Sequence, residues 1–350
     1  MTKSAKPAAG DATPKDEPTL PGSGSEVVVV PGSGSEVVAV EPADKRPADK
    51  RPEMRRPAKS IAKTAKMGAV REMLYFALRN RKLIIGLSVV GFFLLLAIVG
   101  PYLAQHPPLE YSNNLNHAPT LKHGLWLGTT SDGFDVYSQL VNGLRLAFIV
   151  GLIGGGVAAL IGMVVGFTAG YKAGLTDELL NMLTNVVLCI PVFALLLVIA
   201  SFMQIKGVLP ESLLIGFVNW PWAARALRAQ TFSLTSREFV SLARLSGEKT
   251  WKIIFKEIAP NMSSYLFMMF ILLFGGAILT AATLDFIGLG PSGTISLGQM
   301  MQKANQNSAL LLGYWWWFVP PGLAIMLIVG GAYFMNVGLD EVFNPRLREM

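Results

Sequence analysis

The chain has 350 residues, of which 52% are hydrophobic and only 15% are charged, and its mean hydropathy is +0.46. These values exclude a soluble globular protein of this length and indicate a membrane protein. The formal net charge of +7 would suit a nucleic-acid-binding protein. However, most of the basic residues flank apolar runs, where membrane insertion and anionic lipid account for them. We therefore expect contact with membrane lipid and no contact with nucleic acid.

Residues 1–58 differ in composition from the rest of the chain. Pro, Gly, Ser and charged residues dominate them, and the segment PGSGSEVVVV is followed directly by PGSGSEVVAV. Such low-complexity repeats predict a disordered cytoplasmic tail. In residues 59–82, apolar side chains recur at helical spacing among lysines and arginines, which predicts an amphipathic juxtamembrane helix on the inner membrane surface. Residues 83–350 form the predicted transmembrane domain.

Five apolar runs are long enough to cross the roughly 30 Å of bilayer hydrocarbon as helices. They are Leu83–Ala104, Ala147–Gly170, Leu179–Phe202, Ser263–Thr283 and Trp315–Val337. A sixth run, Val208–Ala224, is weaker because it contains Pro210 and Pro221, and it also fits a broken or re-entrant helix. If it counts as a span, all but four of the 30 lysines and arginines fall on the side that holds both chain ends. Because basic loops stay in the cytoplasm, we predict an all-α membrane protein with six transmembrane helices and cytoplasmic N- and C-termini.

Residues 225–261 join two of these runs and carry a charged two-helix pattern. Thr235 and Glu238 fit an S/T-x-x-E capping box, which predicts a helix that starts near Ser236. Gly247 stands where this helix needs a left-handed residue to stop, and Pro260 would end a second helix. Each helix has one predicted apolar face, made of Phe239, Val240, Leu242, Ala243 and Leu245 in the first and of Trp251, Ile254, Phe255 and Ile258 in the second. Such a unit either folds back onto the membrane interface or inserts its apolar face into a groove on a partner.

The order of residues in this segment resembles the EAA loop of binding-protein-dependent ABC importer permeases. That pattern is Glu-Ala-Ala, a later Gly and a terminal hydrophobic-x-Pro, and the corresponding residues here are Ser241, Leu242, Ala243, Gly247, Ile258, Ala259 and Pro260. Ser241 replaces the acidic residue, so packing by Leu242, Ala243 and Leu245 must replace an ionic contact. Residues around the loop resemble the dipeptide and oligopeptide branch, namely Trp220, Pro221, Arg225, Arg228, Arg237, Glu238 and Val240. The resemblance implies that the residues that couple the chain to ATPases are Glu238, Ser241, Leu242, Ala243, Leu245, Gly247 and Pro260.

The segment His123–Ile149, before the second run, is similar to a further segment of this branch. Its glycines and aspartates are typical of a turn-rich loop with local backbone hydrogen bonds. The resemblance adds a contact with an extracytoplasmic substrate-binding protein, for which the candidate residues are Gly128, Asp132, Gly133 and Asp135. Near the C-terminus, Asp285–Gly290 resembles the branch's SFLGLG motif, and the three tryptophans at 315–317 predict an aromatic belt at the outer interface.

The chain lacks the residues for several kinds of chemistry. It has no G-x-x-x-x-G-K-[ST] phosphate loop, because residues 246–250 imitate only its end, so ATP and Mg²⁺ are expected on partner subunits and no cofactor on this chain. Its three histidines, His106, His117 and His123, fit no compact zinc pattern, and we expect no metal site. Acidic residues occur only at the ends of the predicted spans, which argues against a proton- or sodium-coupled carrier.

The resemblance implies a non-catalytic permease subunit with the type I ABC importer fold, in the plasma membrane of a prokaryote. It implies a heterodimer with a second permease, two ATP-binding subunits and an extracytoplasmic substrate-binding protein. The implied activity is import of dipeptides or oligopeptides by alternating access. Families that resemble this one also move oligosaccharides or nickel, so these substrates stay open. The alternatives from other classes are an ATP-independent channel or carrier and a membrane scaffold.

Overall fold

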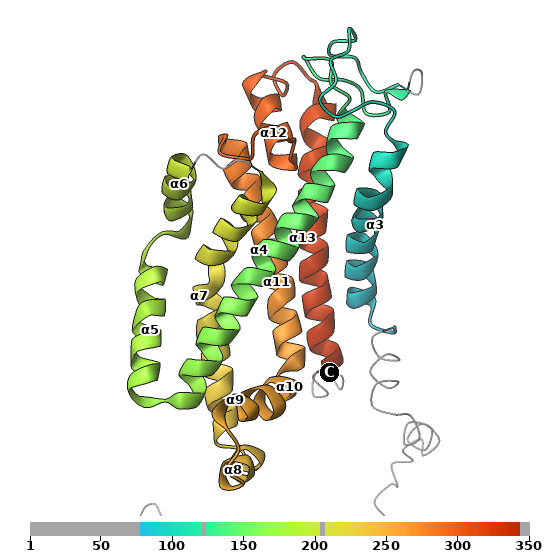
Figure 1. The fold of residues 1–350 in the computed structure, drawn as a ribbon. Coiled ribbons are helices and arrows are strands. Elements are labelled where there is room, and N and C mark those ends of the chain that lie inside the picture. The colour runs from blue at the N-terminus through green and yellow to red at the C-terminus, as the bar shows by residue number, and fades with distance from the viewer. Residues whose placement is uncertain (1–77, 121–123, 204–206, 344–350) are drawn as a thin grey trace, which may run out of the picture. The chain divides into compact units, whose positions relative to one another are not determined.

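The structure is a computed structural model that describes residues 78–120, 124–203 and 207–343. The predicted tail, 1–58, and nearly all of the predicted juxtamembrane helix, 59–82, lie outside the described residues. Within them the chain is helical, and the one extended pairing is an isolated bridge between Thr129 and Asp135. The helical elements (Figure 1) are α3 (Arg81–Leu103), α4 (Val136–Lys172), α5 (Gly174–Cys189), α6 (Val192–Met203), α7 (Val208–Thr235), α8 (Glu238–Leu245), α9 (Thr250–Ile253), a π-helical turn (Ile254–Ile258), α10 (Ala259–Asn261), α11 (Ser263–Ile287), α12 (Leu297–Gln306) and α13 (Trp315–Phe343).

Four of these helices are long and apolar enough to cross a membrane, namely α3, α4, α11 and α13. Helices α5 and α6 reach the length and hydropathy of a span only when taken together, and the helix axis bends by 79° at the break between them. The run predicted as one span over Leu179–Phe202 is therefore not a straight helix. Pro191 explains the break, because its ring disfavours helical backbone at the preceding residue, and Ile190 is extended with φ −82° and ψ 126°.

Helix α7 occupies the weak sixth run and is continuous, in spite of Pro221 in its interior. Its 28 residues extend over about 42 Å, which is long enough to cross a bilayer. It is less apolar than the other long helices and is not among the four that are long and apolar enough to cross a membrane. The described residues thus contain four candidate spans, or five with the bent pair, and the predicted total of six rests on α7.

Helices α4 and α7 lie side by side along most of their length (Figure 1), and a stripe of glycines on α4 allows the close approach. Gly162, Gly166 and Gly170 recur every four residues and so share one face of the helix. A Cβ atom built on each would lie 2.7 Å from the Cβ atoms of Ala223, Leu227 and Thr231 of α7, respectively. Small residues at such an interface let two membrane helices pack by van der Waals contact of their backbones.

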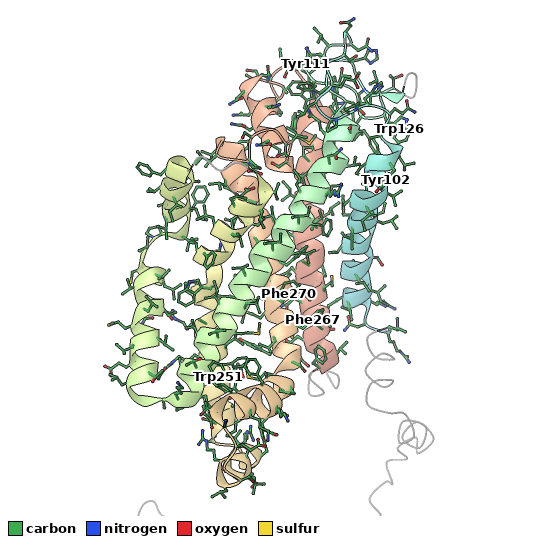
Figure 2. The ribbon with its side chains drawn as sticks, viewed as in Figure 1. Tyr102, Tyr111, Trp126, Trp251, Phe267 and Phe270 are labelled. Atoms are coloured by element: carbon green, nitrogen blue, oxygen red, sulfur yellow. The ribbon has the colours of Figure 1, made fainter. Side chains whose placement is uncertain are left out.

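Two further helices, α3 and α13, pack together at the edge of the bundle, and α3 leaves large apolar side chains uncovered. Phe92 and Leu95 are 60% and 62% exposed, as expected for a helix surface that faces lipid. The end of the bundle that carries α12 also holds the loop between α3 and α4, and Tyr102, Tyr111 and Trp126 lie at this end (Figure 2). Amphipathic aromatic rings favour the headgroup level of a membrane.

The predicted belt of three tryptophans is wrong for two of them. Trp316 and Trp317 are buried, and their indole Nε1–H groups donate to the carbonyl oxygen of Thr129 at 3.2 and 2.9 Å. They therefore fasten the loop between α3 and α4 onto the start of α13. Only Trp315 is half exposed, at 49%.

Replacing Gly166 with Ala should destabilise the protein, because the new methyl group would force α4 away from Leu227. Gly156 on the same helix provides the control, since a Cβ atom there has no neighbour within 4 Å and Ala favours a helix over Gly by about 1 kcal/mol. Thermal unfolding in detergent should therefore occur at a lower temperature for Gly166→Ala and at an unchanged or higher one for Gly156→Ala. Equal unfolding temperatures for both variants would contradict the packing.

Candidate coupling site

The segment that connects α7 to α11 folds into a compact unit at the end of the bundle opposite α12 (Figure 1). It consists of α8, α9, the π-helical turn and α10, and we call it the coupling unit. In Figure 1, α8 projects beyond the ends of α5 and α11, whereas α9 and α10 cross beneath the bundle. The unit therefore has one part that rests on the long helices and one part that extends away from them.

A left-handed glycine ends α8, as predicted. Gly247 has φ +72°, and two nested hydrogen bonds close the end of the helix. The Gly247 N–H donates to the carbonyl of Arg244 at 3.0 Å, and the Glu248 N–H donates to the carbonyl of Ala243 at 3.2 Å. This pair of bonds is the Schellman motif, which satisfies carbonyl groups at a helix end and needs a residue that tolerates positive φ.

The predicted capping box is not formed. Helix α7 continues through Thr235, whose hydroxyl donates to the carbonyl of Phe232 at 2.7 Å instead of accepting from the next helix. Helix α8 then begins at Glu238, two residues later than predicted, with Arg237 before it and no side-chain cap. The carboxylate of Glu238 still lies in the first turn, where the positive end of the helix dipole favours it.

The two predicted apolar faces are each divided between a buried and an exposed part. A cluster under the unit holds the buried side chains, which are Phe167, Leu227, Val240, Ile253, Ile254, Ile258 and Met262. In contrast, Leu242 and Leu245 on α8 are 64% and 84% exposed. Trp251 and Phe255 are also more than half exposed, and their rings stack with centroids 6.0 Å apart.

A π-helical turn, Ile254–Ile258, follows α9. Ile253, Ile254 and Ile258 lie in the buried cluster, whereas Trp251 and Phe255 both turn outward. The predicted apolar face of the second helix is therefore divided between the bundle and the outside.

Polar contacts attach this unit to the corner between α4 and α5. The Arg244 guanidinium lies over the Tyr171 ring, 4.9 Å from its centroid, and its Nε–H donates to the tyrosine hydroxyl at 3.3 Å. Near this corner, Arg228 of α7 holds Asp177 of α5 through two hydrogen bonds of 2.5 and 2.6 Å. Paired bonds between guanidinium and carboxylate fix orientation as well as distance.

The structure places the candidate coupling residues in α8, in the turn that follows it and, for Pro260, in α10. Glu238, Ser241, Leu242, Leu245, Gly247 and Pro260 are exposed, and Ala243 is half-buried against the cluster. We call Leu242 and Leu245 the docking pair, because they are the two large apolar side chains of α8 that the chain leaves uncovered. Ala243 instead supports α8 from below.

The candidate residues of the loop between α3 and α4 mostly serve the loop itself. Gly128 and Gly133 are buried and have φ +74° and +78°, and Asp135 is buried as the cap of α4. Its carboxylate accepts from the N–H groups of Tyr137 and Ser138 at 3.1 and 3.3 Å. Burial raises the pKa of Asp135, and these two hydrogen bonds oppose that rise. Asp132 is the exposed member of the set, so contact with a partner stays a prediction for this residue.

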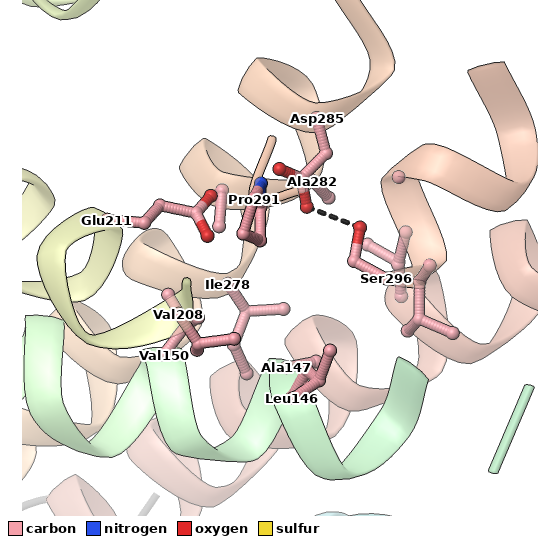
Figure 3. A pocket seen from close by; sticks show the side chains of 14 residues that line it. Leu146, Ala147, Val150, Val208, Glu211, Ile278, Ala282, Asp285, Pro291 and Ser296 are labelled. Atoms are coloured by element: carbon pink, nitrogen blue, oxygen red, sulfur yellow. Dashed lines mark hydrogen bonds between the residues drawn. The ribbon is translucent and has the colours of Figure 1, made fainter. Parts of the chain in front are cut away.

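The opposite end of the bundle contains a buried pair of acidic residues that the sequence did not predict. Glu211 in the first turn of α7 and Asp285 near the end of α11 are only 1% and 2% exposed, and they line the same cavity (Figure 3). Each is an acidic residue at a helix end, as the sequence indicated, but only the packing of α7 against α11 brings the two together and buries them. No local pattern carries that information. The described residues contain no group of three or more His, Cys, Asp or Glu that could hold a metal ion.

Comparison with known proteins assigns the family. Residues 162–349 match the family described as binding-protein-dependent transport system inner membrane component. The chain belongs to this family. Residues 71–119 also match the family described as N-terminal TM domain of oligopeptide transport permease C. The first match covers the whole coupling unit together with α7, α11 and α13, and it confirms the resemblance drawn from the loop between α7 and α11.

Curated members of the permease family resemble the chain over most of their length. The dipeptide transport system permease protein DppC of Alkalihalophilus pseudofirmus is 31% identical over 273 residues, which are 77% of this chain and 88% of that protein. The oligopeptide transport system permease protein OppC of Bacillus subtilis is 28% identical, over 77% and 87% of the two chains. The glutathione transport system permease protein GsiD of Pectobacterium atrosepticum is 29% identical, over 74% and 86%.

Replacing Gly247 with Val should open the turn after α8. A Cβ atom there has no neighbour within 4 Å, so the cost is the backbone strain of positive φ, about 1–2 kcal/mol. Limited digestion with trypsin should then cut at Arg244 and Lys249 roughly 5–30 times faster, because cleavage follows the population of the open loop. Gly247→Asn, which tolerates positive φ, is the matched control and should be cut at nearly the native rate. Native digestion of the valine variant would contradict the strain.

Proposed function

We propose that the chain is a permease subunit of an ATP-driven importer of dipeptides or oligopeptides, and that the docking pair seats in a groove on a cytoplasmic ATPase. The names of the three relatives support the peptide class. The observation that carries the proposal is the exposure of Leu242 and Leu245 on a short helix that projects from the bundle. A soluble protein partner fits this position better than the membrane interface does, because α8 extends away from the spans.

The remaining parts of the complex follow from the same proposal. Helix α7 serves as an additional span, so that the chain has six spans with both ends in the cytoplasm, in the plasma membrane of a prokaryote. A second permease completes the translocation path, and two ATP-binding subunits hold ATP and Mg²⁺, so this chain performs no covalent chemistry. A substrate-binding protein meets the opposite end, where Asp132 is the exposed candidate.

Motion of an ATPase would reach the spans through the contacts of the coupling unit. The buried isoleucines of the unit pack against Phe167 of α4 and Leu227 of α7. Arg244 adds a contact to Tyr171 at the end of α4, and the Arg228–Asp177 pair joins α7 to α5. Because packed helices shift as rigid bodies, a displacement of α8 moves α4, α5 and α7 together. Alternating access results when this motion opens one end of the path and closes the other.

The docking pair can be tested by replacing Leu242 and Leu245 with Glu in the reconstituted transporter. Burying a leucine contributes about 1.5–3 kcal/mol, so the loss of both should weaken ATPase binding at least about 100-fold. ATP-driven uptake of a labelled dipeptide into proteoliposomes should fall to background, and the ATPases should no longer copurify. Leu311→Glu is the matched control, because this leucine is 86% exposed in the loop between α12 and α13.

Two results would contradict the proposal. Normal dipeptide uptake by the double variant would exclude the docking pair as the ATPase contact. Uptake by the native protein that needs no ATP would favour a channel or an ATP-independent carrier, and ATP-driven uptake of nickel or an oligosaccharide in place of peptides would correct the substrate class.

A further inference from the structure

Two carboxyl groups are buried together near the α12 end of the bundle. Glu211 lies in the first turn of α7, and Asp285 lies in the last turns of α11. Their exposed fractions of 1% and 2% mean that both side chains are almost completely shielded from water. Figure 3 shows the two carboxyl groups turned toward the same space, and both line the same cavity.

The space between them is a cavity of about 20 Å³, which is room for a single water molecule. Apolar side chains of α4, α11 and α13 form most of its walls, and Ser296, the residue that caps α12, lies beside them. Among the described residues, no lysine, arginine or histidine lines it. Arg145 of α4 is exposed and lines a separate cavity, and Lys206 lies outside the described residues.

The protein supplies hydrogen-bond donors to only some of the carboxyl oxygens of Glu211 and Asp285. Asp285 Oδ2 accepts a hydrogen bond from the Ser296 hydroxyl at 2.5 Å, and Ser296 also caps α12. Asp285 Oδ1 and Glu211 Oε1 are buried without a hydrogen-bond partner. Gly290 leaves space for Oδ1, because a Cβ atom at this position would lie 2.2 Å from it. The fold thus accommodates two carboxyl oxygens that both face the cavity and lack a donor.

Two ionised carboxylates at this place would be costly. Each buried ion costs several kcal/mol of lost hydration, and two negative charges add mutual repulsion. A bound cation or a proton must therefore neutralise at least one of the two charges. A hard metal ion would need six or more oxygen ligands for Ca²⁺ or Mg²⁺, whereas the described residues around the cavity offer two carboxyl groups and one hydroxyl that already donates. A proton needs only the two facing carboxyl groups.

We propose that Glu211 and Asp285 bind one proton between them, and that this shared proton fastens the start of α7 to α11 and α12. One carboxyl group then donates to the other, which gives the unpaired oxygens a partner and leaves a single negative charge. Charge-assisted hydrogen bonds of this type are short and strong. Ser296 positions Asp285 by its hydroxyl, at the positive end of the α12 dipole.

The test uses the full chain in lipid nanodiscs and difference infrared spectroscopy between neutral and alkaline pH. The native protein should show the C=O stretching band of a protonated carboxyl group, which shifts in ²H₂O and disappears when the pH rises. Glu211→Gln should lose this band, and so should Asp285→Asn. Glu110→Gln, which changes an exposed glutamate in the loop between α3 and α4, is the matched control and should keep it. Lys206→Ala should also keep the band, since a proton and not this lysine holds the pair.

The pH dependence of thermal stability provides a second test, which does not depend on whether Asp285→Asn folds. Thermal stability of the native chain should decrease from neutral to alkaline pH, because the folded state alone holds the shared proton. Glu211→Gln, whose amide can donate to Asp285, should remove this decrease. The proposal is overturned if the band persists in Glu211→Gln, if Lys206→Ala abolishes it, or if Na⁺ or Ca²⁺ at constant pH stabilises the native chain and not Glu211→Gln.

Discussion

The close contact between α4 and α7 is the constraint on which the rest of the structure depends. Glycines at every fourth position of α4 remove the side chains that would separate the two helices. Helix α7 is the least apolar of the long helices and carries a proline, so lipid alone would favour it least. Its packing on α4 supplies the burial that a more apolar sequence would find in the membrane. The contact also sets the position of both ends of α7.

The two ends of α7 lie beside the two features for which we propose a function. One end leads into α8, whose docking pair is exposed and whose base is fixed by Phe167 and Leu227. The other end begins with Glu211, which faces Asp285 across a small cavity. Because one continuous helix, α7, joins the coupling unit to the acidic pair, a displacement of α8 and a change in the hydrogen bonding of Glu211 act on the same rigid element. The helix is a physical connection between the coupling unit and the acidic pair.

The sequence predicted those features that depend on local chemistry. Gly247 ends a helix because only a residue that tolerates positive φ can do so, and apolar length alone indicated α3, α11 and α13. It did not predict features that depend on distant contacts. Packing against α4 and α7 buried Ile254 and left Trp251 exposed. The Thr129 carbonyl accepts hydrogen bonds from Trp316 and Trp317, which lie inside, and Glu211 meets Asp285 only through packing. The sequence of the loop between α7 and α11 also indicated the family, whereas no local sequence pattern indicated the buried acidic pair.

The central claim is that α8 docks on a cytoplasmic ATPase, and site-specific photo-crosslinking in native membranes tests it most directly. A photoreactive amino acid at position 245 should capture an ATP-binding subunit, identified by mass spectrometry, and the yield should change when ATP is added. The same group at position 311, which is equally exposed at the other end, should capture no ATPase. Capture of lipid alone at position 245, under conditions in which a known importer yields its ATPase, would contradict the account.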